Sequence, residues 1–345
     1  MAAYISFQPS DFFNTKLYTG TGSSNAITGV GFQPAFTWIK ARAGSKSHRL
    51  FDSTRGVTKW IASDNTGAES TTAESLKSFD SDGFTLGTYD HVNDNTVTFV
   101  SWNWKAGTTT GIAGSPSITP TAYSFNTTSG CSILTYTGTG ANATLPHGLG
   151  VAPDMILTKE LDAGGNDWGV YHEAMGNTKA VWLNTTAAAG TSSTYWNNTS
   201  PTSTLFTVST NTQSNGSGTD YVAYCFAEKK GFSKNGWYEG NGNADGPFIY
   251  TGFRPAYVLI KKFYDAAENW FVFDDKRLGY NPDNDYQNPN LATADGTGDK
   301  INILSNGFKC IDTAADINQN GTHMLFMAFA EFPFVSSNSK PGTAR

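Results

Sequence analysis

Short apolar stretches recur along the whole chain and are separated by clusters of Gly, Asn, Asp and Pro. Most are about four to eight residues long and rich in β-branched or aromatic residues, which is typical of β-strands bounded by turns. Three of them, residues 97–105, 221–228 and 324–331, are apolar on both faces, as expected for strands buried inside a β-sandwich. A helix is predicted only around residues 73–78. The pattern therefore predicts an all-β fold.

The same landmarks occur three times in the same order. Each copy opens with the motif Tyr-x-Gly-x-Gly, and its tyrosines, Tyr18, Tyr136 and Tyr238, lie 118 and 102 residues apart. Each copy then has a proline six residues before a lysine, and these lysines are Lys40, Lys159 and Lys261. Solenoid repeats have periods of about 20 to 50 residues, so this longer period indicates duplication of a whole domain.

The duplication predicts three tandem homologous β-sandwich domains of a jelly-roll or lectin-like kind, spanning residues 1–107, 108–230 and 231–345. The first boundary falls in a segment of small residues, 106–120, whose composition is typical of a flexible linker. The second boundary, around residues 229–232, is much shorter. We therefore expect the second and third domains to be held more rigidly together than the first and second.

Composition supports the β assignment and narrows the range of partners. Of 345 residues only 15% are charged, whereas 14% are aromatic and 36 are glycine, which argues against both a disordered and a helical protein. The net charge of −6 argues against nucleic-acid binding, which needs clustered Lys and Arg. No apolar run of about 18 residues is present, so no membrane insertion is expected. Residues 1–7 have none of the features of a signal peptide.

The residue types that usually carry chemistry form no recognisable set, so we expect no catalytic residues, no metal and no cofactor. The five histidines lack metal-ligand spacing, and no nucleophile elbow or phosphate loop occurs. The glycines of Tyr-x-Gly-x-Gly are expected to permit a turn or bulge with positive φ. Cys131, Cys225 and Cys310 are expected to be small buried residues.

One string matches the first half of a calcium-binding loop. Residues 316–321 alternate oxygen-bearing side chains before a glycine, but the twelfth position is Met327 instead of the glutamate that such a loop requires. The corresponding segment of the second copy contains Asn215-Gly216 before the same closing strand. Because Asn-Gly is a strong hairpin signal, we expect a hairpin in both copies.

The pair Asp274-Asp275 is a second acidic candidate, since two carboxylates can serve as the acid and the base of a hydrolase. The equivalent positions of the other copies hold Asp52 and His172. A two-carboxylate site is therefore not preserved between the copies, and the pair is not expected to be catalytic.

Aromatic residues outside the repeated strands are the best candidates for ligand contact, because sugar faces stack on Trp and Tyr rings. The candidates for glycan contact are Trp60, Tyr195, Trp196 and Tyr286. Core packing is the alternative for each, since most of the 9 Trp, 15 Tyr and 23 Phe must fill hydrophobic cores.

The repeated string, with its closing Tyr-Val-Ala-Tyr-Cys-Phe-Ala-Glu at 221–228, resembles a family of bacteriophage structural proteins common in marine and aquatic tailed phages. Residues 7–14, 331–334 and 343–345 also resemble the termini of that family. The resemblance implies a virion component that is assembled in the cytoplasm of the host bacterium. Its implied partners are other virion proteins and further copies of itself, and the resemblance carries no catalytic residues.

Two functions remain open at this point. The first is a non-enzymatic structural role in a tail, a tail fibre or capsid decoration, exerted through protein–protein assembly. The alternative is the binding of a host-surface glycan by a receptor-binding protein of the phage tail, which predicts exposed aromatic residues clustered in one loop region. A secreted polysaccharide hydrolase is a third interpretation, and the missing carboxylate pair argues against it.

Overall fold

The computed structural model describes residues 7–265, 267–277, 281 and 285–333, so residues 334 and 343–345, where part of the terminal resemblance falls, lie outside it. The first repeat consists of η1 (Pro9–Asp11), β1 (Phe13–Thr19), β2 (Asn25–Thr28), β3 (Phe36–Ala41), β4 (Arg49–Asp52), β5 (Lys59–Trp60), β6 (Ser70–Thr71), β7 (Leu76–Asp80), β8 (Gly83–Leu86), α1 (Asp90–Asn93) and β9 (Thr98–Trp104). The second consists of β10 (Ala122–Asn126), β11 (Cys131–Thr137), β12 (Ala143–Pro146), β13 (Met155–Glu160), β14 (Gly169–His172), η2 (Glu173–Met175), β15 (Lys179–Trp182), β16 (Gly190–Thr191), α2 (Ser193–Trp196), β17 (Leu205–Val208), α3 (Thr212–Asn215) and β18 (Asp220–Phe226). The third consists of β19 (Ser233–Glu239), β20 (Phe248–Tyr250), β21 (Phe253–Lys262), β22 (Trp270–Asp274), β23 (Tyr286–Gln287), β24 (Ile301–Leu304), β25 (Gly307–Cys310), α4 (Ala315–Asn318) and β26 (His323–Pro333).

The predicted all-β class is confirmed, and the three repeats share one strand order. The large sheets run β1-β9-β3-β4, β11-β18-β13-β14 and β19-β26-β21-β22, with further edge strands in the second and third repeats. The small sheets run β2-β8-β7, β12-β17 and β20-β25-β24. The helix predicted around residues 73–78 is wrong, because Leu76–Asp80 form strand β7 and pair with β8. Among the described residues no helix has the length and apolarity needed to cross a membrane.

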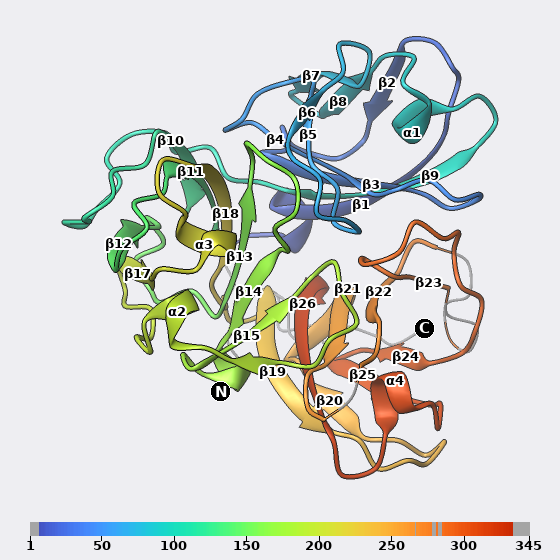
Figure 1. Cartoon of the computed structure of the whole chain (residues 1–345). Helices are drawn as coiled ribbons and strands as arrows, with labels where there is room; N and C mark the ends of the chain where they lie inside the picture. The colour runs from blue at the N-terminus through green and yellow to red at the C-terminus, as the bar shows by residue number, and fades with distance from the viewer. Residues whose placement is uncertain (1–6, 266, 278–280, 282–284, 334–345) are drawn as a thin grey trace.

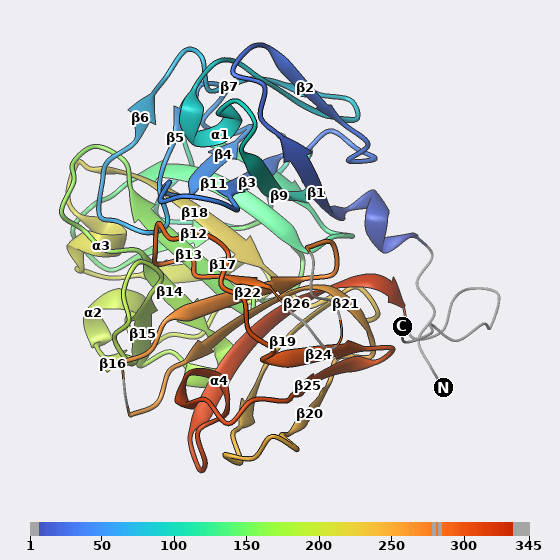
Figure 2. The same cartoon turned by 90° about the vertical axis from the view of Figure 1, so that its right-hand side faces the viewer.

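The three large sheets face one another around the centre of the molecule (Figures 1 and 2). The last strand of the large sheet in each repeat, β9, β18 or β26, is called its closing strand. It is buried on both faces because its side chains alternate between two cores. In β18, Val222, Tyr224 and Phe226 enter a central cluster, whereas Tyr221, Ala223 and Cys225 enter the cluster between the sheets of the second repeat. The strand β26 alternates in the same way. In β9, Val100, Trp102 and Trp104 enter the central cluster, and Phe99 enters that of the first repeat. Ser101 and Asn103 on the same face as Phe99 are buried polar residues.

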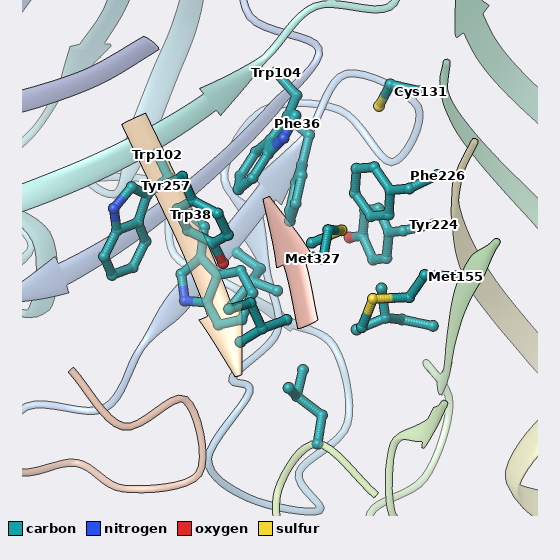
Figure 3. Packing of buried hydrophobic residues seen from close by; sticks show 14 of the residues in the cluster. Phe36, Trp38, Trp102, Trp104, Cys131, Met155, Tyr224, Phe226, Tyr257 and Met327 are labelled. Carbon is teal, nitrogen blue, oxygen red and sulfur yellow. The ribbon is translucent and has the colours of Figure 1, made fainter. Parts of the chain in front are cut away.

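The central cluster is built by all three repeats (Figure 3). Phe36 of the first repeat meets Tyr224 of the second with ring centroids 4.5 Å apart. Trp104 of the first repeat meets Tyr257 of the third at 5.6 Å. Burial of aromatic surface is among the largest favourable contributions to folding. Each repeat therefore depends on the other two for the burial of one face of its large sheet. The domain boundaries given above remain predictions.

Loops join the repeats in a closed circle. After β5, β15 and β23 respectively, each repeat extends a loop over the next repeat, and these loops are residues 62–69, 183–189 and 289–295. Their backbone N–H groups donate to a carbonyl two residues beyond the repeated lysine, in the pairs Glu69 to Leu161, Ala189 to Phe263 and Asp295 to Arg42, at 2.9 to 3.0 Å. The third repeat thus returns to the first, so the arrangement closes as a ring with pseudo-threefold symmetry.

The repeated lysines occupy the same register on β3, β13 and β21, opposite Val100, Val222 and Leu325. All three are fully buried. Lys40 Nζ donates to the Thr293 carbonyl at 2.6 Å, Lys159 Nζ to the Thr66 carbonyl at 3.1 Å, and Lys261 Nζ to the Thr186 carbonyl at 2.8 Å. Each of these carbonyls belongs to the loop of the neighbouring repeat. Each amino group also donates to a carbonyl of its own repeat, at Ala41, Asn166 and Glu268. The hydrogen bonds of each lysine are therefore shared between its own repeat and the next.

Three side-chain N–H groups, from two tryptophans and one histidine, add further hydrogen bonds between neighbouring repeats. Trp168 Nε1 donates to the Ala62 carbonyl and Trp270 Nε1 to the Trp182 carbonyl, both at 2.9 Å. In the first repeat the equivalent position is His48. Its Nδ1 accepts from Trp38 Nε1 at 2.8 Å, so the proton lies on Nε2, which donates to the Asn288 carbonyl at 3.0 Å. Burial lowers the pKa of His48 well below its ordinary value, which keeps this ring neutral.

The Tyr-x-Gly-x-Gly motif holds a buried asparagine at the end of a one-turn helix. Each motif tyrosine donates its hydroxyl to the carbonyl preceding that asparagine, at 2.6 to 2.8 Å. The asparagines are Asn93, Asn215 and Asn318, and each side-chain oxygen accepts a backbone N–H from the motif loop. The predicted hairpins at 215–216 and 316–321 are therefore wrong. The segments form the short helices α3 and α4. The side-chain oxygen of the asparagine accepts a backbone N–H from the motif loop, so the asparagine does not form a hairpin turn.

The two glycines of the motif are required for different structural reasons. The second glycine of each motif adopts the positive φ that the sequence predicts, at 63°, 70° and 68° for Gly22, Gly140 and Gly242. The first glycine is required by close approach: a Cβ at Gly20 would lie 2.0 Å from the Asp94 carbonyl oxygen. The motif is therefore structural.

The three cysteines are buried, as the sequence predicts. In the β11–β18 pairing, Cys131 lies opposite Phe226 and Cys225 lies opposite Ser132. Cys131 belongs to the central cluster and Cys225 to that of the second repeat, so the two side chains lie on opposite faces of one sheet. Burial raises the pKa of the Cys131 and Cys310 thiols to about 12.

We predict that the buried lysines make folding more favourable as the pH rises. Desolvation lowers the pKa of Lys261 to about 7 and those of Lys40 and Lys159 to about 8, against an ordinary 10.5. Between these values the unfolded chain binds more protons than the folded one, so raising the pH stabilises the fold. From about pH 7 to about pH 9, the free energy of unfolding of wild type should rise relative to Lys261→Met by at most about 1.4 kcal/mol per pH unit. Urea unfolding at several pH values measures this, and parallel curves would contradict it.

Candidate functional site

The three junctions between repeats are equivalent places with different side chains. At the junction of the third and first repeats lies a cleft of about 520 Å³, lined by residues that include Asn14, Lys16, Lys276, Glu331 and Phe332. At the junction of the first and second repeats lies a cleft of about 450 Å³ with a more polar lining, which includes Arg55, Lys59, Glu69, Asp162 and Asp220. The ring is therefore symmetric in its backbone and asymmetric in the chemistry of its junctions.

Beneath two junctions lies a buried ion pair that crosses to the next repeat. Asp52 Oδ2 accepts from Arg55 Nε at 2.5 Å and from the hydroxyl of Tyr224 at 2.7 Å. Asp274 Oδ2 likewise accepts from Arg277 Nε at 2.7 Å and from Trp102 Nε1 at 3.0 Å. The Asp and Arg side chains of both pairs are almost completely buried. Both carboxylates are fully occupied by structural donors.

The third junction replaces this ion pair by apolar and neutral groups. His172 and Met175 stand at the positions of Asp and Arg, and the residue facing them from β26 is Met327 instead of Tyr or Trp. His172 Nδ1 accepts from the Ala174 N–H at 3.2 Å, and its Nε2 bonds to the Phe326 carbonyl at 3.2 Å. Burial lowers the pKa of His172 to about 4. This junction therefore lacks both the buried carboxylate and the side-chain donor that bonds to it at the other two junctions.

The pair Asp274-Asp275 points to two different environments. Asp274 bonds across the junction, whereas Asp275 Oδ2 accepts from Lys276 Nζ at 2.8 Å. Burial and, after it, the nearby Glu331 carboxylate raise the pKa of Asp275 to about 7. One carboxylate is therefore locked in an ion pair, and the other is a buried group whose charge is disfavoured. Among the described residues, no group of three His, Cys, Asp or Glu side chains is placed to hold a metal ion.

Two of the exposed aromatic residues lie together at the junction of the second and third repeats. Trp237 on β19 and Tyr264 after β21 are 54% and 47% exposed. Both contact the imidazole of His323 at the start of β26, with ring centroids 4.8 Å and 5.3 Å away. Lys179 of the second repeat places its Nζ 5.6 Å from the Tyr264 ring centroid. We call Trp237, Tyr264 and His323 the aromatic patch.

The aromatic candidates from the sequence lie elsewhere, and the structure does not bring them together. Tyr195 and Trp196 on α2 are 2% and 1% exposed and pack in the core of the second repeat, so they offer no ring face to a ligand. Trp60 is half-buried under the Arg49 guanidinium, 3.9 Å from its ring centroid. Tyr286 is half-buried against Phe271, at 5.0 Å.

Sequence reasoning missed the aromatic patch because it took residues on repeated strands to be core residues. Trp237 immediately precedes the motif tyrosine and lies on such a strand. The repeat itself carries the signal that finds it: the equivalent residues are Leu17 and Thr135. A large aromatic residue that only one copy has is not required by the shared fold.

These features define an all-β protein in which three repeats close into one unit with chemically distinct junctions. The chain belongs to the family described as a domain of unknown function, DUF7483, which matches residues 8–333. A single match therefore spans all three repeats, in agreement with their common core. None of the curated proteins and none of the solved structures matches the chain.

We predict that Arg277→Met destabilises the protein by about 3 to 5 kcal/mol, because it leaves the Asp274 carboxylate buried without its cation. The triple variant Trp102→Met/Asp274→His/Arg277→Met copies the residues of the second–third junction and should be more stable than Arg277→Met alone. Urea unfolding measures both. A single variant within about 1 kcal/mol of wild type would show that the ion pair is dispensable.

Proposed function

We propose that the protein is a non-enzymatic virion structural protein of a tailed phage, a component of the tail, a tail fibre or capsid decoration. It works by binding other virion proteins and further copies of itself, and its location is the virion. The proposal includes the origin of the ring: three homologous copies of a β-sandwich of jelly-roll or lectin-like kind, divided at residues 107 and 230. The shared strand order and the resemblance of the repeated motifs support this proposal.

The observation that carries the proposal is an apolar outer face on the third repeat. Phe248 and Tyr250 on β20 are 46% and 56% exposed, while Ile249 between them enters the core. β20 is an edge strand of its sheet, so its backbone is also open on one side. Adjacent exposed aromatic residues on an open edge are typical of a protein–protein contact surface.

The other repeats provide the comparison. The pairing of β2 with β8 and of β12 with β17 places Ala26 and Thr28, and Thr144 and Pro146, at the positions of Phe248 and Tyr250. The same sheet is thus built without exposed aromatic rings in two copies out of three. Folding does not require Phe248 and Tyr250, which supports a role in contact with a partner.

We predict that Phe248→Ser/Tyr250→Ser lowers the number of copies of the chain in purified particles, because the partner loses its aromatic contacts. The variant should unfold at the same urea concentration as wild type, since both side chains are exposed. Ala26→Ser/Thr28→Ser, on the equivalent face of the first repeat, is the matched control and should leave the copy number unchanged. Quantitative mass spectrometry of particles measures the effect. Absence of the wild-type chain from particles would refute the proposal.

A further inference from the structure

The aromatic patch differs from a hydrophobic core in what surrounds its rings. Trp237 and Tyr264 each present about half of their surface to solvent, and one imidazole, His323, contacts both. Phe263 packs behind the same imidazole with ring centroids 6.3 Å apart and is itself buried. His323 is therefore packed against a buried ring, and both exposed rings are in contact with it.

The equivalent positions of the other repeats show that packing does not require these rings. At the same register in their sheets, Leu17 and Thr135 replace Trp237, and Thr98 and Asp220 replace His323. Ala43 and Asp162 replace Tyr264, each three residues after the repeated lysine. Exposed Trp and Tyr leave apolar surface in water that a smaller residue would not. Three such replacements in one place, in one repeat only, point to a ligand that recovers this surface.

Polar groups of both charges border the patch. The carboxylate of Glu239 lies 3.9 Å from His323 Nε2, and its side chain is 58% exposed. Asp265, which follows Tyr264, is also exposed and lies 3.6 Å from the buried Nζ of Lys262. Lys179 approaches from the second repeat, over the Tyr264 ring. Carboxylates accept hydrogen bonds from hydroxyl groups, and the lysine ammonium donates to them.

We propose that the aromatic patch, with Glu239, Asp265 and Lys179 at its border, is a binding site for a neutral oligosaccharide. A pyranose ring has a face of C–H groups that packs on the electron-rich face of Trp or Tyr, and a rim of hydroxyl groups that needs both donors and acceptors. The two exposed aromatic rings supply the surface on which the sugar face packs. The charged side chains supply hydrogen-bond donors and acceptors for its hydroxyl groups. The Glu239 and Asp265 carboxylates are exposed whereas Lys179 is half-buried, so the border disfavours an anionic sugar.

The site is independent of the proposed virion contact on β20, since no residue is shared between them. It needs neither a metal ion nor a cofactor for the contacts described. It lies where the second and third repeats meet, so its polar border, Lys179 included, exists only in the closed ring.

The test is binding of the purified full-length chain to an array of neutral and acidic oligosaccharides, followed by calorimetric titration with the strongest neutral ligand. Trp237→Thr introduces the residue of the second repeat and Tyr264→Ala that of the first, so both variants suit the fold. Each should weaken binding by more than about tenfold, as loss of an aromatic hot spot does. Trp237→Phe should retain more affinity than Trp237→Thr, because it keeps a ring face.

Tyr250→Ala is the matched control, since it removes an equally exposed aromatic ring of the same repeat outside the patch. It should leave oligosaccharide binding unchanged. The proposal would be overturned if wild type bound no neutral oligosaccharide, if it preferred acidic ones, or if Trp237→Thr and Tyr264→Ala bound as tightly as wild type. Equal losses from Tyr250→Ala would also overturn it. Particle copy number is measured separately, so failure here leaves the virion proposal standing.

Discussion

The burial of three lysine amino groups is the constraint on which the rest of the structure depends. An ammonium removed from water must regain its hydrogen bonds from protein groups, or it strongly disfavours the folded state. Lys40, Lys159 and Lys261 each donate to a backbone carbonyl of a loop from the neighbouring repeat. Each also donates to a carbonyl of its own repeat, at Ala41, Asn166 and Glu268 respectively. A repeat on its own therefore leaves the hydrogen bonding of its lysine incomplete. The loops must therefore cross the junctions, and the circle must close.

Closure in turn separates the interior of the ring from its surface. Inside, the three closing strands feed one aromatic cluster, and substitutions there come in compensating sets: where Met327 replaces a hydrogen-bond donor, His172 and Met175 replace the Asp–Arg pair. Outside, the same backbone positions tolerate Leu, Thr or Trp, as Leu17, Thr135 and Trp237 illustrate. A symmetric scaffold with variable surface positions allows one repeat to expose aromatic residues while all three maintain the fold. The exposed aromatic residues of the third repeat follow this division.

The sequence predicts the local structure better than the assembly of the repeats. The strands, the threefold repeat and the positive φ of Gly22 follow from residue pattern and turn chemistry. The common core could not be predicted, because an apolar strand such as β18 reads the same whether its second face meets solvent, a loop or another repeat. Lysines are mostly exposed in proteins, so burial of Lys159 contradicts the usual expectation. Tyr195 and Trp196 were misjudged because they lie between repeated strands, yet α2 turns both rings inward.

The central claim is that the three repeats fold as one unit, and differential scanning calorimetry of the full-length chain tests it most directly. A shared core and a closed circle of loops predict a single transition in which the calorimetric and van't Hoff enthalpies of unfolding are equal. Two or three resolved transitions, or a calorimetric enthalpy well above the van't Hoff value, would mean that the repeats unfold separately and would contradict the account.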